Sequence, residues 1–301
     1  MSSIAPTSSD PLRALLLLLC AQVFFALLDA SGKYLAADMG IPLIALIRHG
    51  GQVLLMLALL GPRLRLRLLR TAHPALQLLR GLVLSAFTLF FFTALKYLPQ
   101  AEATAITFIA PLIVMLLAGP LLGEQVSRVR WIGATLGFVG MLVVVRPGTA
   151  LALVGVVFAL LTVACNVAFQ LLTRKLAAND DSTTTLFVSA LIATFVSALM
   201  LPLQDTWGGW PTRLDQTQLL LMAALGVLGI IGQWCFIRAY VWSSASFIAP
   251  LVYLQLSWST LSGWWFFDQV PDALSGFGML LIGGSGVAVM WVETHARRRS
   301  T

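Results

Sequence analysis

The chain has 301 residues, of which 59% are hydrophobic and 10% are charged, and its formal net charge is +7. A soluble domain usually carries about 25% charged residues, so this composition excludes a water-soluble globular protein. The basic excess suggests nucleic acid as a partner at first sight, but its distribution along the chain excludes that class, as shown below.

Apolar runs of about 20 residues recur along the whole chain, and a helix of that length crosses a hydrocarbon core of about 30 Å. The connections between the runs are too short to form soluble domains. The prediction is an all-α integral membrane protein with ten membrane-spanning helices. These are expected near residues 12–36, 41–60, 75–97, 101–121, 129–146, 151–176, 184–203, 216–241, 245–266 and 273–292.

The positions of the basic residues predict the orientation of these spans. With the N-terminus in the cytoplasm, 12 of the 19 Lys and Arg residues fall on the cytoplasmic side and four outside, while Arg48, Arg80 and Arg238 lie within spans. Basic residues gather in cytoplasmic loops. We therefore expect a multi-pass protein of a bacterial inner (plasma) membrane with cytoplasmic tails at 1–11 and 294–301, and no nucleic-acid partner.

The first two spans contain four ionisable residues, Asp29, Lys33, Arg48 and His49. Such groups cost about 2.5–3.5 kcal/mol each on insertion scales. Asp29 and Arg48 are both roughly 10–12 Å below the outer surface. Equal depth would allow an ion pair between them, and Lys33, one turn above Asp29, could compete for the same carboxylate.

Two interpretations of this cluster stay open. In the first, Asp29 and Arg48 form a structural pair that locks the two helices. In the second, Arg48 faces a cavity and binds a substrate carboxylate or phosphate through a forked pair of hydrogen bonds, while Asp29 tethers it or accepts a proton. His49 points about 100° away. It could titrate near neutral pH, but a neutral, hydrogen-bonded packing role is favoured.

The sequence contains an internal repeat. The pentapeptide FIAPL occurs at Phe108–Leu112 and again at Phe247–Leu251, 139 residues later, and KYLAAD at 33–38 matches RKLAAND at 174–180 with an offset near 141. Each copy holds five spans. Because five is odd, the second copy must enter the membrane from the opposite side. Inverted repeats are typical of secondary transporters, which expose a central site alternately to either face.

The second half offers amides and aromatic rings as candidate ligands in place of charges. Gln170 takes the place of Asp29 in the second copy, and Trp234 and Trp258 are deep enough to be either cavity residues or packing residues. Two prolines at matching places remove helical hydrogen bonds and predict bends beside the site. The candidates are Asn166, Gln170, Gln233, Trp234, Tyr253, Gln255 and Trp258, with Pro111 and Pro250 as the bends.

Three segments also resemble a known family, namely Ala94–Leu112, Leu121–Val126 and Arg238–Trp258. They look like the two EamA repeats of the drug/metabolite transporter superfamily, and the resemblance covers nearly the whole chain. It implies two five-helix repeats, 12–147 and 150–293, related by an inverted pseudo-twofold axis. It further implies a central cavity lined by helices 1 to 4 and 6 to 9, with helices 5 and 10 outside.

The expected function is a secondary transporter that moves a small polar metabolite, such as an amino acid or a related zwitterionic or aromatic metabolite, across the plasma membrane by alternating access. Export is favoured over import of a vitamin or nucleoside-derived metabolite. An integral-membrane enzyme is the alternative from another class, disfavoured because the three histidines are dispersed. No nucleotide-binding fingerprint is present, and no cofactor or metal is expected. The oligomeric state is open between a monomer and a homodimer.

Overall fold

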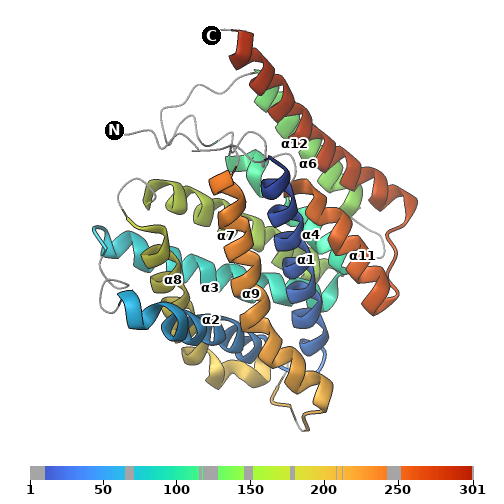
Figure 1. The fold of residues 1–301 in the computed structure, drawn as a ribbon. Helices are drawn as coiled ribbons and strands as arrows, with labels where there is room; N and C mark the ends of the chain where they lie inside the picture. Colours follow the sequence, from blue (N-terminus) through green and yellow to red (C-terminus); the bar gives the residue numbers. More distant parts are fainter. Residues whose placement is uncertain are drawn as a thin grey trace.

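The computed structural model describes residues 11–64, 71–114, 117, 128–145, 152–176, 180–207, 209–211, 213–242 and 252–299. Within these ranges the regular structure is entirely helical (Figure 1). The helices are α1 (Pro11–Leu35), α2 (Ile41–Leu64), α3 (Pro74–Tyr97), α4 (Gln100–Thr107), α6 (Arg128–Val145), α7 (Leu153–Leu176), α8 (Ser182–Leu199), η2 (Leu201–Trp207), α9 (Gln216–Trp242), η3 (Val252–Leu254), α11 (Gln255–Phe267) and α12 (Ala273–Arg299).

Five of these helices are long and apolar enough to cross a membrane, namely α1, α2, α3, α7 and α9. Four further predicted spans contain shorter apolar helices, at Gln100–Val114, Trp131–Val144, Thr183–Leu199 and Ala273–Val289. The ninth predicted span contains α11, which is 13 residues long. Every predicted span thus contains a helix among the described residues, and five of them have the length and composition of a full crossing.

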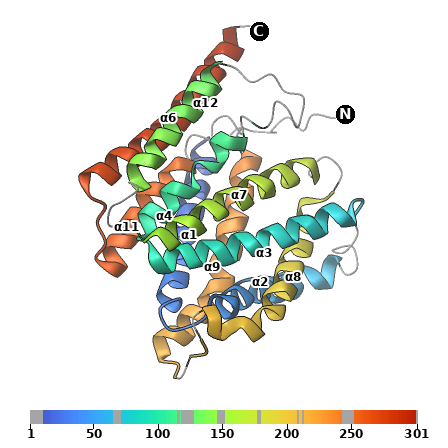
Figure 2. The same ribbon diagram turned by 180° about the vertical axis from the view of Figure 1, so that it is seen from behind.

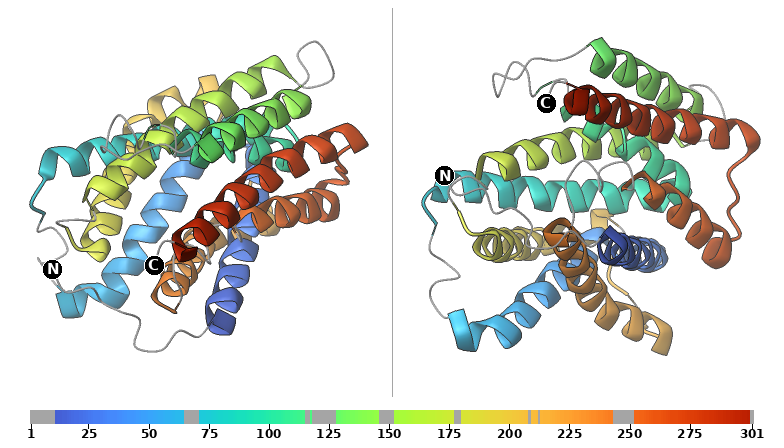
Figure 3. Two further views of the ribbon diagram at one scale, coloured as in Figure 1. Left: turned by 90° about the horizontal axis from the view of Figure 1, so that it is seen from above. Right: turned by 45° about the horizontal axis from the view of Figure 1, so that its top comes forward.

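Eight helices form a closed ring. In the order in which they touch, these are α1, α9, α2, α8, α3, α7, α4 and α11, and α11 packs back against α1. The remaining two long helices, α6 and α12, pack along each other at the edge of the molecule (Figures 2 and 3). Consecutive helices α1 and α2 are therefore not neighbours, because α9 lies between them.

Each contact between neighbouring helices of the ring has a counterpart. In the counterpart, each helix is replaced by the equivalent helix of the other half of the chain. The α1–α9 interface has its counterpart in α7–α3, α2–α9 in α8–α3, and α1–α11 in α7–α4. At α2–α9 the closest backbones are Gly51 and Gly226, and at α8–α3 Gly81 lies against Ile192, which is 141 positions after Gly51. This matched packing fits an architecture of two five-helix repeats.

Two equivalent Gln–Asp hydrogen bonds, each joining the two halves of the chain, lie at opposite ends of the ring. Gln218 Nε2 donates to Asp38 Oδ2 at 2.9 Å, where α1 ends and α9 begins. Gln77 Nε2 donates to Asp180 Oδ2 at 2.8 Å, where α7 ends and α3 begins. We call these the Asp38 end and the Asp180 end.

The Asp180 contact predicts a pH dependence of stability. Burial raises the pKa of Asp180, but hydrogen bonds from Thr71, Ala72 and Gln77 outweigh it and hold this pKa below its ordinary value. A carboxyl with a lowered folded pKa stabilises the fold above its unfolded pKa, near 3.9, and this contribution is lost as the pH falls through the folded value. Asp180→Asn should lower the thermal unfolding midpoint near neutral pH, and the difference from wild type should shrink below about pH 4.

The same substitution at Asp205, which is exposed, is the control for this prediction. Asp205→Asn should leave the midpoint unchanged across the pH range. A pH-independent difference between wild type and Asp180→Asn would contradict the account.

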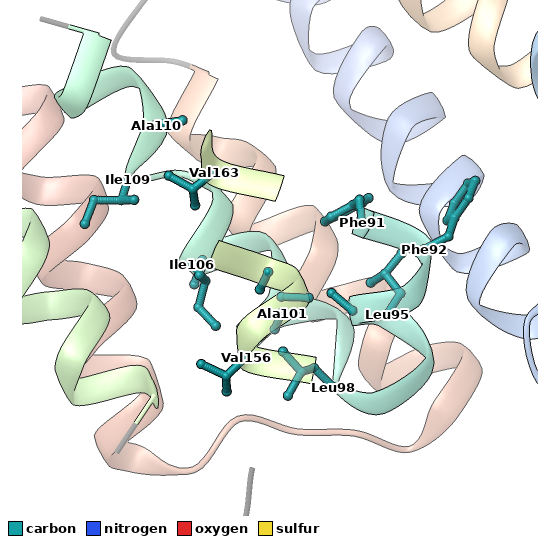
Figure 4. Packing of buried hydrophobic residues seen from close by; sticks show 14 of the residues in the cluster. Phe91, Phe92, Leu95, Leu98, Ala101, Ile106, Ile109, Ala110, Val156 and Val163 are labelled. Carbon is teal, nitrogen blue, oxygen red and sulfur yellow. The ribbon is translucent and has the colours of Figure 1, made fainter. Parts of the chain in front are cut away.

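A buried apolar cluster joins α3, α4 and α7. It includes Leu95 and Leu98 near the end of α3, Ile106 in α4 and Val156 in α7, all of them at most 6% exposed (Figure 4). Phe92, fully buried, points away from the α7 side chains toward a neighbouring pale blue helix. This cluster therefore fixes the end of α3 against α4 and α7, and it leaves the Phe92 ring to pack against Gly32 of α1.

Candidate functional site

Helices α1, α2 and α3 bring charged and aromatic side chains together. The Arg48 guanidinium of α2 lies 5.4 Å from the ring centroid of Phe92 in α3. That ring fills the space beside Gly32 of α1, where an added Cβ would be 2.2 Å from the Phe92 ring. Asp29, one turn before Gly32, is close enough to Arg48 to interact with it electrostatically. The site thus combines a cation held against an aromatic face with a nearby carboxyl.

The Arg48 guanidinium donates no hydrogen bond to any residue that the structure describes. Both Arg48 and Asp29 are only partly buried. Within the described part of the chain, neither makes a hydrogen bond, and they do not form the direct ion pair that their equal depth suggested. The reason is the helix order: α9 separates α1 from α2 in the ring. The forked guanidinium is therefore free to bind an anionic group.

Lys33 does not donate its hydrogen bonds to Asp29. Its ammonium donates to the carbonyl oxygens of Leu95, at 2.8 Å, and Leu98. It also lies 5.4 Å from the Phe267 ring centroid. Lys33 thus ties the end of α1 to the end of α3, and it is a contact between helices rather than part of the Arg48 site.

His49 packs between helices, as favoured from the sequence. It is 2% exposed, and its Nε2 is 3.0 Å from Thr88 Oγ1 of α3. The α2–α3 contact therefore uses this histidine, while its neighbour Arg48 turns toward the Phe92 ring.

The candidates from the second half fall into two groups. Gln170 donates to Asn166 Oδ1 at 3.1 Å within α7, and both are partly buried, as is Gln233 in α9. Gln255 is 7% exposed, and its Oε1 accepts no hydrogen bond from the described residues. Trp234, by contrast, is 55% exposed and faces away from the ring, stacked with Arg238.

Two aromatic candidates lie at the rim of the ring rather than with Arg48. Tyr253 packs on Phe108, with ring centroids 5.6 Å apart, and against Gly286 of α12. Trp258 lines a groove of about 230 Å³ beside α1. The structure therefore brings Asp29 and Arg48 together with Phe92, which the sequence did not single out, and places Tyr253 and Trp258 elsewhere.

The predicted bend at Pro111 is present. Helix α4 ends at Thr107, a turn follows at Phe108 and Ile109, and the helix resumes at Ala110. Proline 111 cannot donate to a carbonyl one turn back, which explains the break. Pro250 lies outside the described residues.

Arg80 is a buried cation that the sequence analysis placed within a span without giving it a role. It is 3% exposed, and its Nε donates to Thr173 of α7 at 2.8 Å. Its Nη1 donates to Ser189 Oγ at 2.5 Å and to the Thr185 carbonyl at 3.2 Å, both in α8. The Phe169 ring lies 4.2 Å from its guanidinium carbon. Arg80 therefore binds α3 to two helices of the other half through neutral acceptors.

Replacing Arg80 with Ala should lower the free energy of unfolding by about 1–3 kcal/mol, because buried acceptors lose their donor. Arg80→Met keeps most of the side-chain volume and should lose less than Arg80→Ala. Thermal unfolding in detergent measures both, and Arg238→Ala, at an exposed arginine, is the matched control. An Arg80→Ala variant as stable as wild type would show that the network contributes nothing.

The structure also brings two cysteines together that the sequence left apart. The sulfur atoms of Cys20 in α1 and Cys235 in α9 are 3.9 Å apart, and both are free thiols. Their proximity follows from the packing of α1 on α9, which the order of the spans along the chain does not reveal.

Several characterised proteins are similar to this chain. A riboflavin transporter of Vibrio cholerae is 27% identical over 96% of both chains. The pseudopaline exporter CntI of Pseudomonas aeruginosa is 29% identical over 89% of this chain and 92% of its own. An S-adenosylmethionine uptake transporter of Rickettsia felis is 26% identical over 77% of this chain and 76% of its own.

A solved crystal structure shares the fold. It superposes with a TM-score of 0.65 at 23% identity, covering 96% of this chain and 99% of its own. The model of the EamA-like transporter family matches residues 12–146 and 153–291, one match for each half of the ring. The chain therefore belongs to the EamA-like transporter family of the drug/metabolite transporter superfamily, and it is a membrane transporter rather than an enzyme.

Proposed function

We propose that this membrane transporter is a secondary transporter that moves a small polar metabolite with an anionic group by alternating access. The observation that carries the proposal is the Arg48 guanidinium, which lies against Phe92 with no hydrogen bond to the described protein. A guanidinium binds a carboxylate or phosphate through two parallel hydrogen bonds. Burying such a cation without using its donors is costly, so a ligand that accepts from it compensates part of that cost.

The substrate class follows from the other groups of the site. The fully buried Phe92 ring holds the Arg48 guanidinium against its face, and the Asp29 carboxyl favours an amino group or another cation on the ligand. An amino acid or a related zwitterionic metabolite fits the Arg48 and Asp29 groups. The named substrates of the relatives are riboflavin, S-adenosylmethionine and pseudopaline, which makes these three compounds the first members of a test panel.

We also propose how the two repeats are oriented in the membrane. The repeats are 12–147 and 150–293 with inverted orientation, supported by the matched packing of the ring. The basic residues favour both termini in the cytoplasm, so the Asp180 end of the ring is cytoplasmic and the Asp38 end faces outward. The relatives include an exporter and uptake transporters. Export is the first direction to test and import the second.

Ligand-dependent thermal unfolding followed by flux tests this function. The purified protein is heated with riboflavin, S-adenosylmethionine, pseudopaline and the standard amino acids, because a ligand of the native state raises its midpoint. Labelled forms of the compounds that stabilise it are then given to proteoliposomes without ATP. We expect saturable equilibration above the rate of protein-free vesicles. A ligand that stabilises the protein without crossing the membrane would indicate a receptor instead.

A further inference from the structure

Helices α1 and α9 pack antiparallel along nearly their whole length (Figure 1). At one end of this interface, Gln218 of α9 donates to Asp38, which follows α1. At the other end, the Arg13 guanidinium of α1 lies 5.3 Å from the ring centroid of Trp242, the last residue of α9. The two helices belong to different halves of the chain. A ligand that binds between them therefore joins the two halves.

Two thiols face each other inside this interface. The sulfur atoms of Cys20 in α1 and Cys235 in α9 are 3.9 Å apart, and both cysteines are free. Cys235 is 4% exposed, and Cys20 is partly buried. The neighbouring contacts between the two helices are apolar and involve Leu18, Phe25, Gly232, Phe236 and Ala239. The pair of thiols thus lies in tightly packed, apolar surroundings.

The repeat does not supply a second pair of thiols. At the repeat offset of 141 positions, Cys20 corresponds to Leu161 and Cys235 to Ala94. The equivalent interface between α7 and α3 therefore has an apolar side chain in place of each sulfur. The third cysteine of the chain, Cys165, is a free thiol in α7. The chain thus has one dithiol, and any ligand of that dithiol should bind once per chain.

The number and type of donors limit what this dithiol can bind. Thiolate sulfur is the ligand that soft metal ions prefer. Zinc needs four ligands in a tetrahedron, and among the described residues there is no group of three or more His, Cys, Asp or Glu side chains that could hold a metal ion. Two sulfurs alone suit an ion of linear coordination, such as Cu(I), Ag(I) or Hg(II). Two metal–sulfur bonds of about 2.3 Å in line would span about 4.6 Å, so the thiols need to separate only slightly.

The apolar surroundings favour a divalent ion among these three. Each thiol loses its proton when it binds a metal. Two thiolates with Hg(II) have no net charge, whereas two thiolates with Cu(I) or Ag(I) carry one negative charge. A net charge in apolar surroundings is costly. The mercuric ion therefore fits this dithiol best.

We propose that Cys20 and Cys235 form a binding site for one thiophilic divalent metal ion, with Hg(II) as the ion that fits, and that the bound ion bridges α1 and α9. When mercuric chloride binds, two Hg–Cl bonds and two S–H bonds break, and two Hg–S bonds form. Two protons and two chloride ions leave. No electron is transferred, so binding needs no oxidant or reductant.

Retention of mercury against a competing monothiol tests the site. The full-length protein is purified, reduced, freed of reductant, given mercuric chloride and dialysed against a monothiol, and the bound mercury is then counted. We expect wild type to retain one Hg(II) per chain. Cys20→Ser and Cys235→Ser should each hold mercury about a hundredfold more weakly or worse, because two linked donors gain at least that factor from their effective concentration.

Cys165→Ser is the matched control, because it removes a thiol and leaves the pair intact. It should retain one Hg(II) per chain, as wild type does. A wild-type protein that loses mercury as readily as Cys235→Ser would show that the thiols bind metal separately, and this would overturn the proposal.

X-ray absorption at the mercury edge reports the coordination of the bound ion. We expect two sulfur neighbours and no chloride in wild type, and one sulfur in Cys235→Ser. A wild-type spectrum with one sulfur and one chloride neighbour would contradict a bridging ion even if mercury is retained.

Thermal unfolding shows whether the ion joins the two helices. It would link cysteines that are 215 positions apart, and such a link restricts the unfolded chain as a disulfide does. One equivalent of Hg(II) should raise the unfolding midpoint of wild type and Cys165→Ser, but not that of Cys20→Ser or Cys235→Ser. An equal change in all four proteins would contradict the bridge. None of these measurements uses a transported compound, so the metal site and the proposed function are tested separately.

Discussion

Replacing Arg48 with Ala should weaken binding of the transported ligand by about ten- to a hundredfold. A hydrogen bond to a charged group contributes about 1.5–3 kcal/mol, and each 1.4 kcal/mol is a factor of about ten in affinity. The Arg48 donors have no hydrogen-bond partner within the described protein, so the substitution removes ligand contacts and, inside the protein, only the packing of Arg48 on Phe92. The unfolding midpoint without ligand should stay close to wild type, because the substitution removes a partly buried charge and breaks no hydrogen bond among the described residues.

Two further variants define what Arg48 contributes. Arg48→Lys keeps the charge but not the forked geometry, so its affinity should fall between wild type and Arg48→Ala. A ligand and its analogue without the carboxylate should differ strongly in affinity for wild type and little for Arg48→Ala. If Arg48→Ala weakened the affinity for the ligand and for its analogue equally, Arg48 would shape the site without contacting the anionic group. If the Arg48→Ala variant bound the ligand with full affinity, Arg48 would not be part of the binding site.

Replacing Gly226 with Val should be among the most destabilising substitutions in the ring. An added Cβ at Gly226 would lie 2.9 Å from Gly51 Cα and 3.0 Å from its carbonyl carbon. Backbone atoms cannot rotate away as a side chain can, so α2 and α9 must separate. Overpacking typically costs about 1–3 kcal/mol, and a backbone clash should reach the upper part of that range. The decrease in the thermal unfolding midpoint measures it.

Gly284 supplies the matched control for this substitution. It lies in the middle of α12, and nothing is within 4 Å of an added Cβ. Gly284→Ala should be neutral or slightly stabilising, because alanine favours a helix over glycine by up to about 1 kcal/mol. If Gly226→Val and Gly284→Ala had the same effect, the close approach of α2 and α9 would not contribute to stability.

The helical architecture was predictable because long apolar runs have few alternatives in a membrane. Helix positions, the break beside Pro111 and the packing role of His49 all follow from local sequence. The order of helices in the ring does not. Equal depth on consecutive helices left a direct Asp29–Arg48 pair open as one of two interpretations, but α9 separates those helices. The same insertion explains why Cys20 lies beside Cys235.

The direction in which individual side chains point was the least predictable feature of the structure. Helices that are apolar all round carry no clear amphipathic signal, so nothing in the sequence shows that Trp234 points outward or that Phe92 points inward. The contacts of Lys33 and Arg80 could not be predicted from the sequence for a related reason. Their partners are carbonyl and hydroxyl oxygens on other helices, and neutral acceptors occur at too many places in a sequence to identify a partner.

The measurement that tests the central claim most directly is counterflow in proteoliposomes, using the panel compound that stabilises the protein most. Vesicles loaded with unlabelled compound are diluted into labelled compound without ATP or an ion gradient. An alternating carrier should accumulate label transiently above the outside concentration, and Arg48→Ala should abolish this accumulation at subsaturating ligand. Label that only equilibrates, with no transient accumulation in wild type, would indicate a channel and contradict alternating access around the Arg48 site.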